Sequence, residues 1–152
     1  MNFAPHIPDS SAPPDVLVVD DHADTRVLMQ RLLKLDGYSS AAVDSAGAAL
    51  TYLAASMPRL IITDFNMPGM DGLQLLIALR ADERFQRMPV IMFSAMSGNI
   101  RELSLSRGAN AFIPKSTLDW AQIRVEVIRL IGAGTLPAAA ATRPQRQDLE
   151  TR

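Results

Sequence analysis

The chain contains no cysteine among its 152 residues. A disulfide framework and a thiolate metal site are therefore excluded, and a reducing cytoplasm is the expected setting. No apolar run is long enough to cross a bilayer, so we expect no membrane insertion. The N-terminal sequence MNFAPHIPDSSAPPD has neither the basic start nor the apolar stretch of a signal peptide. Neither sign of charge dominates, since 15 Lys and Arg residues balance 16 Asp and Glu residues, and this balance predicts no direct binding of nucleic acid.

What the sequence does contain is enough apolar material, 48% of all residues, for one domain with a sizeable core. The two ends differ from the middle. Residues 1–14 are punctuated by prolines and read as a flexible N-terminal arm. Residues 132–152 are rich in Ala and Pro and end in polar residues, which is typical of a flexible tail or the stump of a linker. The predicted domain therefore spans residues 15–131.

Within this domain, short apolar runs alternate with apolar residues at helical spacing. The runs predict strands at 16–19, 38–43, 60–62, 90–93 and 109–113. The helical stripes between and after them are Val27, Leu28, Leu32 and Leu35; Ala46 to Met57, stopped by Pro58; Leu73, Leu76 and Leu79; Ile100 to Ser106; and Trp120 to Ile131. Gly37 suits the C-terminal end of the first helix. Five repeats of strand and helix predict an α/β fold with a parallel, doubly wound sheet covered by helices on both faces.

Polar residues follow four of the predicted strands. Asp20 and Asp21 come directly after the first strand, Asp64 ends the third, Ser94 ends the fourth and Lys115 lies just past the fifth. Because ligands of such sheets bind at the carboxyl ends of the strands, we expect these residues to converge. Carboxylates bind a hard cation such as Mg²⁺, and a lysine and a hydroxyl can bind phosphoryl oxygens. The set suits acyl-phosphate chemistry.

Each of these residues also has a purely structural interpretation. Asp20 and Asp21 could cap a helix, and MPGMDG could be only a turn. A serine that ends a strand is usually structural. His22 is interpreted as a solvated loop residue rather than a ligand, and Met67, Met88, Met92 and Met96 as packing residues.

Four motifs in order, VLVVDDH, ITDFNMPGMDG, FSA and AFIPK, resemble the receiver domains of two-component response regulators over about residues 15–131. The resemblance implies a flavodoxin-like (βα)5 fold with strand order 2-1-3-4-5. It also implies a phosphoacceptor switch rather than an enzyme, with no reaction beyond self-phosphorylation and autodephosphorylation. The expected donor is a histidine kinase or a histidine phosphotransfer protein, and the expected cofactor is Mg²⁺, with Mn²⁺ as a substitute.

The resemblance assigns the reacting group and the metal ligands residue by residue. Asp64 is the expected phosphoacceptor. Asp21 would bind the cation directly and Asp20 through water, with Asp64 and the backbone carbonyl of Asn66 completing the protein ligands.

The resemblance also assigns the residues around the phosphoryl group. Ser94 and Lys115 would bind it, and Phe112 matches an aromatic switch position whose ring turns inward when the serine moves. Asn66 and Met96 would border the approach of the hydrolytic water. The output face for a downstream protein would consist of the helix from about Ile100, the strand at 109–113 and the last helix.

The sequence departs from the family pattern after the lysine. Pro114 precedes Lys115 and Ser116 follows it, whereas the family usually has proline after the lysine, often with a cis peptide bond. A cis bond before Ser116 would cost about 2.5–4 kcal/mol.

Two other functions compete with the phosphorylated switch. The first is a Mg²⁺-dependent phosphatase with an aspartate nucleophile, which usually has a second carboxylate two residues later as general acid; Asn66 occupies that position. The second is a degenerate receiver that serves only as an interaction module, which would normally lack one of the five polar residues. No output domain is recognisable, so the chain is either a single-domain regulator, which its tail favours, or a piece cut at a linker.

Overall fold

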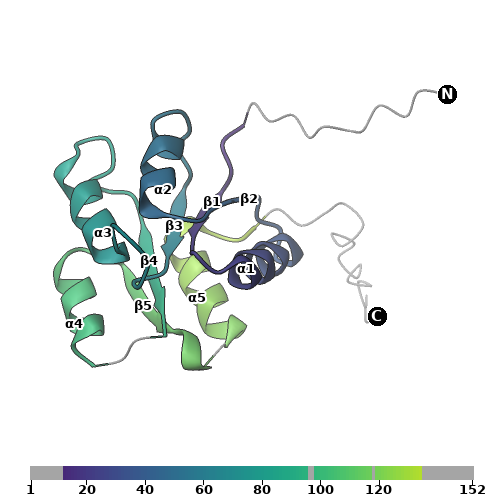
Figure 1. Cartoon of the computed structure of the whole chain (residues 1–152). Helices are drawn as coiled ribbons and strands as arrows, with labels where there is room; N and C mark the ends of the chain where they lie inside the picture. Colours follow the sequence, from purple (N-terminus) through teal and green to yellow (C-terminus); the bar gives the residue numbers. More distant parts are fainter. Residues whose placement is uncertain (1–11, 96–97, 118, 135–152) are drawn as a thin grey trace, which may run out of the picture.

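The structure, a computed structural model, describes residues 12–95, 98–117 and 119–134 (Figure 1). Five parallel strands form one sheet in the order β2-β1-β3-β4-β5. The strands are β1 (Val16–Val19), β2 (Ser40–Val43), β3 (Leu60–Thr63), β4 (Val90–Ser94) and β5 (Ala111–Pro114). The helices are α1 (Ala23–Leu35), α2 (Ala46–Leu53), α3 (Gly72–Ala81), α4 (Asn99–Ser106) and α5 (Trp120–Ile131). The predicted doubly wound fold and its strand order are confirmed.

The central strands β1, β3 and β4 are buried on both faces, which explains why they are almost wholly apolar rather than alternating, with polar residues only at the ends of β3 (Thr63) and β4 (Ser94). One apolar core joins the sheet to α2 and α3 through residues such as Leu53, Leu76 and Phe112. The other joins it to α1 and α5 through residues such as Leu33 and Val127. Figure 1 shows the same division, with α2, α3 and α4 on one side of the sheet and α1 and α5 on the other.

The prediction of which face of α1 is buried is wrong. Val27, Leu28 and Leu35 are exposed, and Leu35 is 74% exposed. Met29 and Leu33, four residues apart, carry the buried face instead. The helix contains two apolar stripes, and the sheet selects the one that also packs on Tyr38 and α5.

The end of α1 follows the prediction made from Gly37. This glycine has a φ of +85°, a left-handed conformation that residues with a Cβ rarely adopt. Its amide donates to the carbonyl of Lys34, and the amide of Tyr38 donates to the carbonyl of Leu33. This pair of bonds is the Schellman motif, which satisfies carbonyls that the helix leaves without partners.

Several element boundaries differ from the prediction by a few residues. Helix α2 ends at Leu53 and does not reach Met57, the residue directly before Pro58. Strand β2 starts at Ser40, and β5 starts at Ala111. Within the described ranges, no helix is both long enough and apolar enough to cross a membrane.

Candidate functional site

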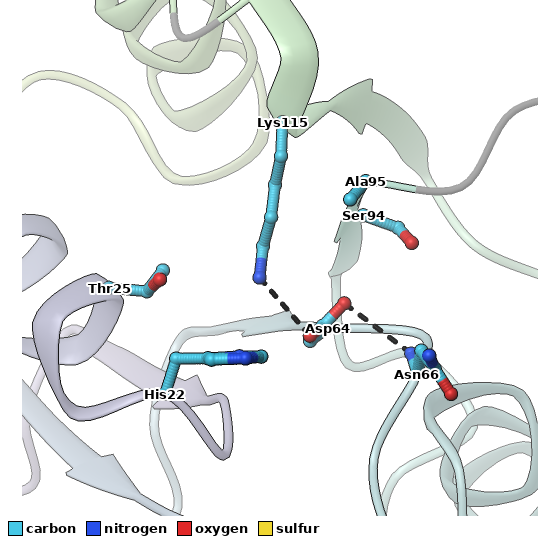
Figure 2. Close-up of a pocket in the computed structure, with 7 residues that line it drawn as sticks. All are labelled: His22, Thr25, Asp64, Asn66, Ser94, Ala95 and Lys115. Carbon is cyan, nitrogen blue, oxygen red and sulfur yellow. Dashed lines mark hydrogen bonds and ion pairs between the residues drawn. The ribbon is translucent and has the colours of Figure 1, made fainter.

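The parallel sheet brings the predicted polar residues to one edge. Asp20 follows β1, Asp64 follows β3, Ser94 ends β4 and Lys115 follows β5. The central strands β1 and β3 are neighbours, so Asp20 and Asp64 lie on either side of the point where the strand order reverses. Asp64 and Lys115 line an open cleft of about 280 Å³ with five other residues, namely His22, Thr25, Asn66, Ser94 and Ala95 (Figure 2).

Lys115 joins the carboxylates. Its ammonium nitrogen donates to Asp20 Oδ2 at 2.7 Å and to Asp64 Oδ2 at 3.1 Å. All three side chains are withdrawn from solvent, with exposures of 17% for Lys115, 2% for Asp20 and 5% for Asp64. Ion pairs this deep are weakly screened by salt.

Burial sets the protonation behaviour of the pair. Desolvation raises the pKa of Asp64 above its ordinary value, and the attraction and hydrogen bond of Lys115 offset only part of this effect. Burial alone would lower the pKa of Lys115, but the hydrogen bond and charge of Asp20, with those of Asp64, raise it on balance. Lys115 therefore stays cationic, and Asp64 is a more basic carboxylate than an exposed aspartate.

One carboxylate oxygen of the site has no hydrogen-bond partner. Asp21 Oδ1 is buried and accepts no hydrogen bond in the structure, and such an orphaned oxygen costs free energy unless something binds it. Ligand atoms of Asp20, Asp21, His22 and Asp64 lie within 4.8 Å of one another. Clustered carboxylate oxygens are the donors that Mg²⁺ and Mn²⁺ prefer, so the residues present fit a divalent cation.

The loop after β3 fixes Asp64 from the backbone side. The amide of Gly72 donates to the carbonyl of Phe65 at 2.8 Å, and a Cβ at position 72 would lie 2.0 Å from the carbonyl oxygen of Asp64. Only glycine can bring α3 this close to the acceptor. Asp71 and Gln74 then start α3 with a reciprocal capping box. MPGMDG thus includes a helix start, and its Gly69 has a φ of +75°.

The remaining predicted residues have mixed outcomes. Ser94 is buried and lines the cleft. Phe112 is already largely buried against the core on the α2 and α3 side. The peptide bond after Lys115 is trans, as are all others in the described part of the chain. Met96 lies outside the described residues.

Sequence reasoning missed the position of His22. Its side chain is 67% exposed, as expected for a loop residue, but Nδ1 lies 3.1 Å from Asp21 Oδ1 and 3.3 Å from Asp20 Oδ1. Thr25, on the first turn of α1, also lines the cleft and was not anticipated. The available signal was adjacency: His22 directly follows the acid pair, and Thr25 is three residues further on.

A second hollow, of about 260 Å³, lies against β5. Its lining comes from α4, β5, α5 and the turn before β5, and consists of Arg101, Leu105, Asn110, Ala111, Phe112, Ile113, Gln122 and Glu126. Phe112 therefore borders this hollow as well as the core beneath the sheet.

Comparisons with known proteins agree with this geometry. Residues 16–127 match the family model of the response regulator receiver domain. The chain is 35% identical to the chemotaxis protein CheY of Pseudomonas aeruginosa over 102 residues, which are 66% of this chain and 82% of that protein. It is 41% identical to the response regulator protein FleR of the same organism over 66% of this chain, but this match covers only 21% of FleR. A solved response regulator receiver protein from Pseudomonas putida has 30% identity and a TM-score of 0.71, with 78% of this chain and 98% of that one covered.

Proposed function

Because the chain belongs to the response regulator receiver domain family, we propose that Asp64 accepts a phosphoryl group from a phosphohistidine. The donor is a histidine kinase or a histidine phosphotransfer protein. The observation that carries the proposal is the Lys115 ammonium 3.1 Å from a desolvated Asp64 carboxylate in an open cleft. A carboxylate oxygen of Asp64 attacks phosphorus, the bond between phosphorus and the imidazole nitrogen breaks, and the electron pair leaves with the imidazole.

The reaction depends on a divalent cation, Mg²⁺ or Mn²⁺. Asp21, Asp64 and the backbone carbonyl of Asn66 would hold it directly, and Asp20 would hold it through water. The bound cation neutralises phosphoryl charge. Asp21 Oδ1, buried without a hydrogen bond, supports this assignment.

The side chains of the cleft orient and stabilise the phosphoryl group. Lys115 supplies a positive charge to one phosphoryl oxygen, and the hydroxyl of Ser94 donates to another. Asn66, which lines the cleft, and Met96, which lies outside the described residues, would border the path of the hydrolytic water as the family resemblance implies. Proton transfer to a leaving group needs an acid, and Asn66 at the position of the phosphatase acid supplies none. The chain is therefore a phosphoacceptor switch, not an enzyme that acts on other substrates.

The output is a change in the surface formed by α4, β5 and α5, which binds a downstream protein. Ser94 and Phe112 would link the phosphoryl cleft to this surface. Ser94 lines the phosphoryl cleft, and Phe112 lines the second hollow, which lies between α4, β5 and α5. The domain that switches is residues 15–131; the predicted arm at 1–14 and tail or linker at 132–152 lie mostly outside the described residues.

The test is transfer from a labelled phosphohistidine donor. Wild-type protein is expected to gain a label that hydroxylamine removes, as it does from acyl phosphates, and borohydride reduction should mark position 64. Asp64→Asn is expected to gain none and to keep its fold by circular dichroism. Asp44→Asn, an exposed aspartate in the loop after β2, is the matched control and should label normally. Labelling of Asp64→Asn at the wild-type rate and stoichiometry would overturn the proposal.

A further inference from the structure

We infer that His22 is a direct ligand of the divalent cation and makes the site prefer imidazole-binding transition ions, such as Co²⁺, Ni²⁺ and Zn²⁺, over Mg²⁺. The inference rests on the proposed function only in placing the cation among Asp20, Asp21 and Asp64. It adds a nitrogen donor to an otherwise all-oxygen ligand set.

The geometry around Asp21 carries the inference. His22 Nδ1 lies 3.1 Å from Asp21 Oδ1, yet that oxygen accepts no hydrogen bond. Two donor atoms at this separation, unconnected by a hydrogen bond, resemble neighbouring ligands of one ion. Octahedral ligands about 2.1 Å from an ion lie about 3.0 Å apart. Asp64 belongs to the same group of ligand atoms, all within 4.8 Å of one another.

The ring of His22 makes one long hydrogen-bond contact, between Nδ1 and Asp20 Oδ1 at 3.3 Å, and both residues belong to the same group of ligand atoms. His22 is the N-cap residue of α1, but its side chain makes no capping hydrogen bond. The backbone does the positioning instead, because the His22 amide donates to Asp20 Oδ1 at 2.9 Å. Figure 2 shows the ring extended into the cleft, toward the side occupied by Asp64 and Asn66, rather than folded back along the helix.

The chemistry of the donors then sets the preference. Mg²⁺ takes oxygen ligands and gives up its water reluctantly, so an imidazole adds little to its binding. Imidazole suits Ni²⁺, Zn²⁺ and related ions, and affinity rises along the series from Mn²⁺ to Ni²⁺. Removing His22 should therefore weaken the transition ions selectively. We expect a loss at least as large as the roughly 10–100-fold caused by removing a residue that merely supports a metal ligand.

The experiment measures affinities by calorimetry at one fixed pH on metal-free, tag-free protein. Mg²⁺, Mn²⁺, Co²⁺ and Ni²⁺ are titrated into wild type and His22→Asn. Asparagine is a good N-cap residue, so α1 should be retained. The matched control is His6→Asn, which removes the other of the two histidines and lies outside the described residues. A spectroscopic readout accompanies it: bound Mn²⁺ should show nitrogen modulation in pulsed electron paramagnetic resonance in wild type and His6→Asn, but not in His22→Asn.

The outcomes separate the inference from the proposed function. The inference is supported if His22→Asn loses Co²⁺ and Ni²⁺ affinity and the nitrogen signal while keeping Mg²⁺ affinity. It is overturned if His22→Asn changes all ions equally or none, or if the nitrogen signal persists. Asp21→Ala tests the shared premise: Mg²⁺ binding that does not need Asp21 would sink the metal site of the proposed function itself.

Discussion

Lys115 Nζ donates to Asp20 Oδ2 at 2.7 Å, a shorter contact than its 3.1 Å bond to the candidate phosphoacceptor Asp64. The lysine therefore divides its charge between two buried carboxylates that would otherwise repel each other. Phosphorylation of Asp64 would place a more highly charged group beside the same ammonium. We expect Lys115 to move from Asp20 toward that group.

Lys115→Met should destabilise the metal-free protein, because it leaves Asp20 and Asp64 buried without a cation. Removing one partner of a buried ion pair typically costs about 3–5 kcal/mol. Proton uptake by Asp64 should relieve part of this cost. Urea unfolding in chelator measures the effect, and excess Mg²⁺ should narrow the gap to wild type. Lys34→Met, in the exposed last turn of α1, is the control and should cost about 1 kcal/mol or less. Equal losses in the two variants would contradict the bridging role of Lys115.

Tyr38 should lower the stability of the folded chain at alkaline pH. Its hydroxyl donates to the carbonyl of Gly132 at 2.6 Å. Burial, and then the charge of Asp36, raise its pKa above the ordinary value of 10.0. Well below pH 10.0 the tyrosine is protonated in both folded and unfolded chains, and its contribution to stability is complete. As the pH rises further, the unfolded chain loses this proton first, so stability falls until the pH passes the folded pKa.

Tyr38→Phe should therefore be less stable than wild type by about 1 kcal/mol at neutral pH, the usual value of one hydrogen bond. The difference should shrink at alkaline pH. Denaturant midpoints across this range measure it, with Tyr52→Phe as the reference for the other tyrosine. A gap between wild type and Tyr38→Phe that stays constant through the alkaline range would contradict the mechanism.

Gly108 and Gly47 should respond in opposite directions to alanine. Gly108 has a φ of +105°, and a Cβ there would lie 2.9 Å from Arg80 Nε. Arg80 cannot retreat easily, because its guanidinium donates to the carbonyls of Gly108, Phe85 and Met88. Gly108→Ala should destabilise by roughly 1–3 kcal/mol. A Cβ added to Gly47, in α2, would meet nothing within 4 Å, so Gly47→Ala should stabilise by roughly 0.5–1 kcal/mol. Urea midpoints that shift in the same direction for both would refute this account.

The output face should respond to a phosphoryl mimic. Adding beryllofluoride and Mg²⁺ is expected to shift amide resonances in α4, β5 and α5 as well as around Asp64. The same addition to Asp64→Asn should leave the resonances of α4, β5 and α5 unshifted. Changes confined to the loops around Asp64 would mean that the switch is not transmitted.

The lifetime of the phosphoryl group should depend on residue 96. Methionine holds a water poorly and its flexible apolar chain would cover the site, so Met96→Glu should accelerate autodephosphorylation. One lost or misplaced water contact is worth roughly tenfold in rate, or about 1.4 kcal/mol. Decay of the labelled protein after removal of the donor gives both half-lives. Equal half-lives would show that residue 96 does not affect the water.

The sequence predicted the fold well because each buried strand is an apolar run with a polar residue at its end. Asp20, Asp64, Ser94 and Lys115 therefore also marked the edge of the sheet where the cleft lies. The face of α1 was not predictable, since two apolar stripes share that helix and only packing against the sheet decides between them.

Other parts of the site depend on side-chain conformations that no spacing rule contains. The pairing of Lys115 with Asp20 joins residues 95 positions apart. The ring of His22 turns toward the carboxylates, although its exposure is that of an ordinary loop residue. Arg80 was not singled out in the sequence, because its carbonyl partners at 85, 88 and 108 come together only in the folded chain.

The separation of Asp20 from Lys115 along the chain also matters while the protein is being made. A nascent chain acquires the acidic residues early, but the lysine arrives only with the end of β5. Until that strand docks, the carboxylates lack the cation that offsets their repulsion. If Asp64 is the phosphoacceptor, as proposed, the site is complete only once β5 has joined the sheet. A prematurely terminated chain that lacks β5 would also lack Lys115, and we expect it not to accept a phosphoryl group.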